Sequence, residues 1–235
     1  MRFARTFPAL FIFGVAFAYV EASVVVYLRA DLEPVRRATF PPDKDDGLFP
    51  LLTVPQLQSA GPQHVRILAV EVFRELATLV MLAAAGLMIA GNFRQWLAGF
   101  MISFGVWDIF YYVFLRLLID WPQSVMTWDI LFLVPVPWVG PVISPIIVAV
   151  SMIVAGSAIL WRDSIGRPIA FGVFHWAMIF GGGLIVIVAF CWDWRHTSVG
   201  GLPNPFNWSL FALGEVVGMA GFVAAVSRPP APNRA

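Results

Sequence analysis

Apolar residues occur along this chain in six long stretches, separated by polar segments of very different lengths. Each stretch is close to or above the ~20 residues that an α-helix needs to cross a hydrocarbon core of ~30 Å. We therefore predict an all-α fold, a polytopic transmembrane helix bundle of about six spans that forms a single domain over residues 1–235. The expected spans are residues 7–28, 67–90, 96–118, 140–160, 169–191 and 206–226.

The polar segments predict how the bundle is oriented. Two short turns that carry arginine, residues 92–95 and 162–168, lie on the same side as both chain ends. The long loop 29–66 lies on the other side, and its positive charges are more thinly spread. Because dense positive charge in short loops marks the cytoplasmic side, we expect both termini in the cytoplasm. The expected location is a cell membrane, either a plasma membrane or a bacterial inner membrane.

Residues 121–141 depart from the helical pattern. Proline recurs there too often for a regular helix, and tryptophan, which favours the membrane interface, occurs three times. We expect an irregular segment on the outer side that leads along the interface into the fourth span. The alternative is a segment that folds back over the bundle as a lid, with Trp128, Asp129 and Trp138 as its lid residues.

Composition supports the membrane assignment and excludes several classes of partner. The chain is 60% hydrophobic and only 12% charged, against about 25% charged in soluble domains. A net charge of +1 without a basic stripe gives no reason to expect nucleic acid binding. The single cysteine, Cys191, excludes an internal disulfide and a cysteine-rich metal site. We predict no cofactor; the lipid bilayer is the expected partner, together with a homo-oligomer or a larger membrane complex as open alternatives.

Five ionisable residues interrupt the apolar stretches: Glu21, Arg74, Glu75, Asp108 and Glu215. A charge at the centre of a membrane helix costs ~2.5–3.5 kcal/mol on insertion scales, so each is a candidate functional residue. At ~1.5 Å of rise per residue, the four carboxylates lie ~16–22 Å from the inner boundary of their spans. Since four separate helices place a carboxylate at a similar depth, we predict that these residues form one site.

Neighbouring polar residues extend this predicted site along the helix faces. Residues three and four apart share a face of a helix, so Glu71 joins Arg74 and Glu75. Tyr112 and Arg116 continue the face of Asp108 in the same way. Small residues on the faces that carry Glu21 and Glu215 would let the helices approach closely. The predicted binding residues are therefore Glu21, Glu71, Arg74, Glu75, Asp108, Tyr112, Arg116 and Glu215.

The predicted site contains more negative than positive charge. Four carboxylates against Arg74 leave three uncompensated negative charges, or two if Arg116 also takes part. A buried carboxylate without a partner takes up a proton, or a bound cation supplies the missing charge. The structural alternative is that Arg74 is clamped between carboxylates and that the remaining acids are protonated and only hold helices together.

Three functions remain open at this point. The favoured hypothesis is that the protein binds or translocates a proton, a cation or a cationic small molecule, and is not an enzyme. The second is a non-catalytic subunit of a larger membrane complex. The third is an intramembrane enzyme that modifies a lipid or an isoprenoid and uses its carboxylates as acid and base. The chain contains no zinc-protease, P-loop, Rossmann or hydrolase motif, and His175 is expected to be structural.

Overall fold

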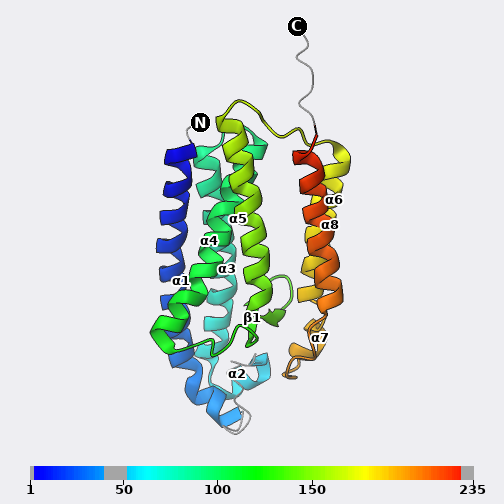
Figure 1. The fold of residues 1–235 in the computed structure, drawn as a ribbon. Helices are drawn as coiled ribbons and strands as arrows, with labels where there is room; N and C mark the ends of the chain where they lie inside the picture. The colour runs from blue at the N-terminus through cyan, green and yellow to red at the C-terminus, as the bar shows by residue number, and fades with distance from the viewer. Residues whose placement is uncertain (1–2, 40–51, 229–235) are drawn as a thin grey trace.

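A computed structural model of the protein describes residues 3–39 and 52–228, and it confirms the all-α membrane bundle (Figure 1). Six of its helices are long and apolar enough to cross a membrane, as the sequence pattern predicts. They are α1 (Phe3–Thr39), α3 (Pro62–Ile89), α4 (Phe93–Ile119), α5 (Ile143–Ser164), α6 (Val173–Phe190) and α8 (Trp208–Val226). Two short helices, α2 (Val54–Ala60) and α7 (Trp194–Thr197), lie between them in the chain.

The segment 29–66, expected to be a loop, is helical in most of its described part. Helix α1 continues to Thr39, well past the predicted end of the first span at residue 28. Glu33 binds Arg36 and Arg37 one turn further on, at 2.8 and 2.7 Å, and such pairs favour a helix outside the membrane. With 37 residues α1 is ~56 Å long, so it projects beyond a hydrocarbon core of ~30 Å. Residues 40–51 of the expected loop lie outside the described residues.

The proline-rich segment between α4 and α5 contains a short antiparallel hairpin. Strand β1 (Trp128–Phe132) pairs with β2 (Trp138–Pro141), with Asp129 opposite Gly140. Helix α5 begins directly afterwards, and Pro145 lies in its first turn, where a missing backbone N–H breaks no helical hydrogen bond. The irregular segment is thus confirmed, while the pairing of its two halves could not be read from the sequence.

The six long helices form two groups. Helices α1, α3 and α5 all pack against α4, which is the most buried of the set. Helices α6 and α8 pack tightly on one another and contact the rest of the bundle far less (Figure 1). Glycines allow this pairing, since a Cβ atom added at Gly182 would lie 2.4 Å from the backbone nitrogen of Gly218. We call these two units the four-helix group and the α6–α8 pair.

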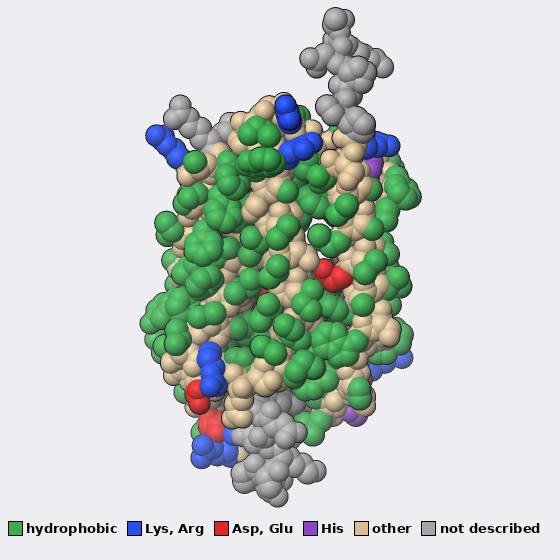
Figure 2. Space-filling model, in the orientation of Figure 1, with side chains coloured by type: hydrophobic (Ala, Val, Ile, Leu, Met, Phe, Trp, Pro, Cys, Tyr) green, Lys and Arg blue, Asp and Glu red, His purple; other side chains and the backbone are tan. Residues whose placement is uncertain are grey.

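The two ends of the bundle differ. Helix α1 begins and α8 ends at one end, which we call the termini end, and the β1–β2 hairpin lies toward the opposite, hairpin end (Figure 1). Hydrophobic side chains cover the middle of the visible face, and basic side chains gather at its two ends (Figure 2). This distribution suits contact with a lipid bilayer. Which end faces the cytoplasm remains a prediction from the loop charges.

Candidate functional site

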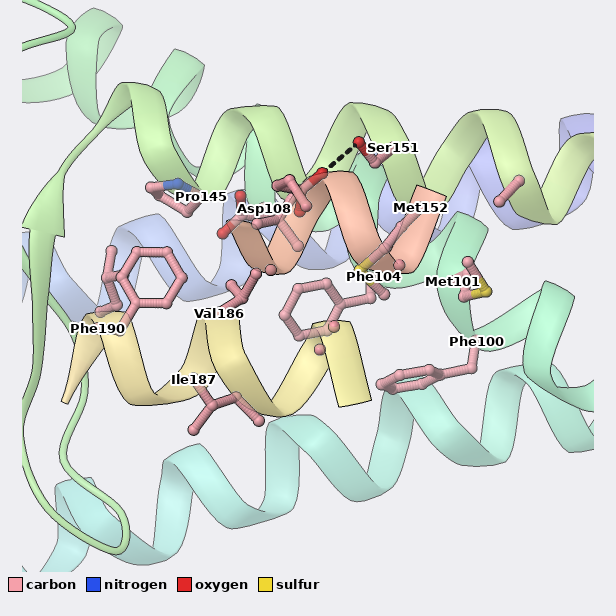
Figure 3. Close-up of a pocket in the computed structure, with 18 of the residues that line it drawn as sticks. Phe100, Met101, Phe104, Asp108, Pro145, Ser151, Met152, Val186, Ile187 and Phe190 are labelled. Atoms are coloured by element: carbon pink, nitrogen blue, oxygen red, sulfur yellow. Dashed lines mark hydrogen bonds between the residues drawn. The ribbon is translucent and has the colours of Figure 1, made fainter. Parts of the chain in front are cut away.

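A cavity of about 450 Å³ lies between the four-helix group and the α6–α8 pair, with the hairpin at one end. We call it the membrane cavity. Its volume is within the ~300–1,000 Å³ of ordinary small-molecule pockets. Toward the termini end its lining is apolar and aromatic and includes Phe100, Met101, Ile159, Trp176, Phe180 and Phe222. Toward the hairpin end the same cavity is lined by several acidic and hydroxyl-bearing side chains (Figure 3).

Asp108 brings a carboxyl group to this cavity from the middle of α4. Only 7% of the surface of this residue is exposed. Its Oδ2 atom has no hydrogen-bond partner in the part of the chain that the structure describes. A buried carboxylate oxygen without a partner is costly, which makes this atom a candidate for contact with a ligand.

Glu215 reaches the same cavity from α8, on the opposite wall. It accepts a hydrogen bond from the Ser151 hydroxyl of α5 at 2.9 Å, the dashed line in Figure 3. This bond links the α6–α8 pair to the four-helix group. Within the described ranges, neither Glu215 nor Asp108 forms an ion pair with an arginine or lysine.

Arg74 of α3 organises a second group of carboxylates, nearer to α1. Its guanidinium forms ion pairs with Glu21 of α1 and with Glu71 one turn earlier on α3. The Nε atom donates to Glu71 at 2.8 Å, and the Thr78 hydroxyl donates to Glu21 at 2.5 Å. One cation therefore compensates two carboxylates, and the contacts with Glu21 join α1 to α3.

Glu75, one residue beyond Arg74, contacts the hairpin rather than a cation. Its carboxylate accepts a hydrogen bond from the backbone N–H of Leu133 at 2.8 Å. Leu133 directly follows β1, so Glu75 fixes the end of that strand beside α3. The side chain is 93% buried and lines the membrane cavity.

Asp129 fixes the hairpin from within β1. The Tyr112 hydroxyl donates to it at 3.0 Å, and Arg29 of α1 lies 4.0 Å away. Burial raises the pKa of Asp129 to about 6, while Arg29 and the Tyr112 hydrogen bond oppose that rise. Together with Glu75, these contacts attach the hairpin to three helices of the four-helix group.

A smaller cavity of about 150 Å³ lies on the other side of this polar layer, between α1, α2, α3 and the hairpin. We call it the vestibule. Glu71, His64 and Arg29 line only the vestibule, whereas other residues line both cavities. The shared residues are Arg74, Glu75, Tyr111, Leu131 and Asp129. The wall between the two cavities is therefore built largely from ionisable side chains.

The structure places the predicted site residues in several environments. The four carboxylates expected at one depth, Glu21, Glu75, Asp108 and Glu215, all line the membrane cavity. Tyr112 and Trp138 line it as well. Whether these residues bind a ligand remains a prediction.

Besides Glu71, which lines the vestibule, two predicted residues do not line the membrane cavity. Arg116 binds Asp120 at 3.0 Å and nearby backbone carbonyls, and its side chain is half exposed, so it does not compensate the buried acids. Trp128 packs edge-on against Phe206. Arg116 lies in the last turn of α4, and Trp128 is the first residue of β1. Helical spacing selected Arg116 but does not take into account that the helix ends there.

Trp107, Ser151 and Thr78 line the cavity and were not among the predicted site residues. Trp107 precedes Asp108, and its indole Nε1 has no partner in the described residues; the same holds for Nε1 of Trp138. An aromatic series on α4 could have indicated Trp107, since Phe100, Phe104, Trp107 and Tyr111 follow helical spacing. Thr78 shares the helix face of Glu71, Arg74 and Glu75 by its spacing. No sequence signal singles out Ser151, whose role depends on its contact with α8.

No protein-family model matches this chain, and no match occurs among the curated proteins or the solved structures compared. The function must therefore be argued from the cavity. Among residues 3–39 and 52–228, no group of three or more His, Cys, Asp and Glu side chains is placed to hold a metal ion. His175 has a structural contact, because its Nδ1 accepts from the backbone N–H of Gly172 at 2.9 Å at the start of α6.

Proposed function

We propose that this integral membrane protein binds an organic cation in the membrane cavity. The observation that carries the proposal is a pair of carboxylates, Asp108 and Glu215, on opposite walls of one largely apolar cavity without a basic partner in the described residues. A bound cation would supply the positive charge that these acids lack. An aromatic and aliphatic lining would hold the apolar part of the same molecule.

The size and lining of the cavity favour an organic molecule over a bare ion. A volume of about 450 Å³ far exceeds what a single inorganic cation occupies. Such ions also require about six oxygen ligands in a compact shell, whereas most of this lining is hydrocarbon. Aromatic rings, in contrast, attract organic ammonium groups through their faces. The proposal therefore selects a cationic small molecule among the ligands expected from the sequence.

The test is ammonium binding to the full-length protein in lipid nanodiscs. We expect saturable binding of radiolabelled phenethylammonium to the wild type. Asp108→Asn and Glu215→Gln, which keep side-chain shape and remove charge, should each weaken binding at least ~10-fold, the loss of one good charge contact of ~1.4 kcal/mol. Asp120→Asn is the matched control, because it removes one acidic charge from an exposed position beside Arg116.

Two results would contradict the proposal. One is wild-type affinity in both Asp108→Asn and Glu215→Gln, with thermal unfolding showing that the variants are folded. The other is equal binding of phenethylammonium and of neutral phenylethanol to the wild type, since the charge would then contribute nothing. If Asp108→Asn unfolds, Glu215→Gln alone decides, because Glu215 is only partly buried.

A lipid-modifying enzyme is the second candidate. The observation that favours it is the same pair of carboxylates on opposite walls, an arrangement that could supply a general acid and a general base to one substrate. Mass spectrometry of nanodisc lipids before and after incubation with the protein distinguishes the two functions. Binding without any change in lipid mass supports the binding protein, and new lipid products that require Asp108 support the enzyme.

A further inference from the structure

We infer that the ligand is a single-chain amphiphilic amine whose head binds between Asp108 and Glu215 and whose hydrocarbon chain extends toward the termini end. It enters from the bilayer between α5 and α8. This inference rests on the proposed binding of an organic cation and adds the ligand's shape, its orientation and its route of entry.

The membrane cavity has its acidic side chains in the hairpin half, among apolar ones, whereas its termini half is hydrocarbon and aromatic. Asp108, Tyr112 and Asp129 lie in its hairpin half, whereas helix positions nearer the termini end contribute hydrocarbon and aromatic side chains. In Figure 3, Pro145 and Phe190 lie nearest to the hairpin strand, Asp108 follows, and Phe100 and Met101 lie furthest from the strand. A compact cation would occupy only the part of the cavity beside the acids. A molecule with one charged end and one long chain fits the whole cavity.

The head region offers buried polar atoms without partners. The Oδ2 atom of Asp108 can accept a hydrogen bond from an ammonium group, and the Glu215 carboxylate lies on the facing wall. The indole N–H groups of Trp107 and Trp138 also lack partners in the described residues and line the same cavity. These donors can bind an oxygen atom carried by the head, and the indole rings can contact its charge.

The cavity reaches the lateral surface of the bundle between α5 and α8. These two helices touch at few positions, whereas α8 packs closely on α6. Figure 2 shows an acidic side chain in a hollow there, surrounded by hydrophobic side chains. A charged group in the middle of a lipid-facing surface costs free energy. An ammonium group that enters from this side would compensate that charge.

Entry from the bilayer also predicts what determines selectivity. A hydrocarbon chain that moves from lipid into an apolar cavity gains little from the hydrophobic effect, because both surroundings exclude water. The charged head exchanges its contacts with interfacial water for contacts with two carboxylates. We therefore expect the head to decide whether an amphiphile binds, and the chain to decide how it is oriented.

The experiment is photo-crosslinking in nanodiscs with a dodecylammonium probe that carries a diazirine at its terminal carbon. We expect labelled peptides to come from the termini half of the cavity, residues 97–104 of α4 and 176–183 of α6. Unlabelled dodecylammonium should compete and dodecanol should not. Asp108→Asn should reduce cavity labelling at least ~10-fold, while Asp120→Asn leaves it unchanged.

The outcomes separate this inference from the proposed function. Saturable phenethylammonium binding combined with labelling only of lipid-facing residues, unchanged by Asp108→Asn, overturns the amphiphile inference and leaves cation binding intact. Labelling in the hairpin half alone overturns the orientation. An Ala155→Trp variant, which fills the middle of the cavity, should abolish cavity labelling by the dodecyl probe and retain binding of butylammonium. If the wild type binds neither phenethylammonium nor dodecylammonium, both proposals are overturned.

Discussion

The two walls of the membrane cavity differ in the charged contacts that join their helices. In the four-helix group, α1 and α3 are joined by Arg74 with Glu21 and Glu71. In the α6–α8 pair, glycines allow backbone contact, and Gly182 lies directly against Gly214 and Gly218. Glycines also allow close backbone contact in the four-helix group, at Gly105 and Gly156. What distinguishes the first wall is the ion pairs of Arg74, whereas the helices of the second wall share no ion pair in the described residues.

The difference explains where the unpaired carboxylates occur. Arg74 compensates the acids beside it, whereas Asp108 and Glu215 lie on the faces where the two walls meet without packing closely. We therefore propose that the charges within a wall stabilise the fold, and that the charges of Asp108 and Glu215, which face the space between the walls, bind the ligand. The following variants test that division, beginning with the largest expected effect.

Replacing Arg74 with methionine should destabilise the four-helix group most. It leaves the buried Glu21 and the half-buried Glu71 without a cation, and removing one partner of a buried ion pair costs ~3–5 kcal/mol. Chemical unfolding in detergent measures the change. Arg116→Met is the control, since its exposed pair with Asp120 should contribute ~0–1 kcal/mol. Equal stability of the two variants would show that the Arg74 contacts are not structural.

Asp129 should make the attachment of the hairpin depend on pH. Its pKa is raised from 3.8 to about 6 in the folded protein, so folding favours the protonated form. The stability that protonated Asp129 contributes is therefore complete below pH ~4 and is lost as pH rises through about 6. The loss is about 2–3 kcal/mol, from roughly two pKa units at ~1.4 kcal/mol each.

Asp129→Asn should remove this part of the pH dependence, measured as the difference between variant and wild-type stability from pH ~4 to ~7. The charged and titratable groups around Asp129 are Arg29 of α1, Tyr111, Tyr112 and Asp108 of α4, and Arg74 and Glu75 of α3. All of them remain in the variant. Asp120 is exposed, so Asp120→Asn should leave the pH dependence of stability unchanged. A profile unaltered by Asp129→Asn would contradict the assignment.

Gly182→Ala tests the second wall. The added Cβ atom would lie 2.4 Å from the Gly218 nitrogen and 2.6 Å from the Gly214 oxygen, which forces α6 and α8 apart. Overpacking of this kind costs ~1–3 kcal/mol. The neighbour Gly183 provides a matched control, because a Cβ there meets nothing within 4 Å. Gly183→Ala should be neutral or stabilising by up to ~1 kcal/mol. Identical behaviour of the two variants would argue against close backbone packing.

Asp108→Leu should have the smallest effect on stability and the opposite sign. It replaces a buried carboxylate that has no ion pair in the described residues with a hydrocarbon side chain, which should stabilise the fold by ~1 kcal/mol. Phenethylammonium binding should be lost in the same variant. If Asp108→Leu instead destabilises the protein as much as Arg74→Met, the carboxylate is structural and the division between the two walls fails.

Much of the bundle could be predicted from one sequence because membrane helices appear in it as long apolar stretches. The apolar stretches located all six long helices, and the small residues beside Glu215 indicated a close contact that the structure places between α8 and α6. Helix ends were less predictable. The first apolar stretch ends at residue 28, whereas Glu33, Arg36 and Arg37 pair one turn apart and continue α1 outside the membrane.

The candidate site could be predicted only in outline. Depth along each helix was enough to expect that Glu21, Glu75, Asp108 and Glu215 line a common region. It could not assign Arg74 to Glu21 or Glu75 to Leu133, because those partners lie 53 and 58 residues away in the chain. Nor could it exclude Arg116, whose helical spacing from Asp108 is correct but whose side chain turns toward Asp120.

The sequence by itself determined the class of protein and the depth of its acids, since hydropathy and helical rise are local properties that each segment carries on its own. Tertiary structure decided which acids are compensated and which are left facing a cavity. That outcome depends on how closely whole helices approach one another. Glycine faces bring α6 and α8 together, while α5 and α8 remain far enough apart to leave space between Asp108 and Glu215.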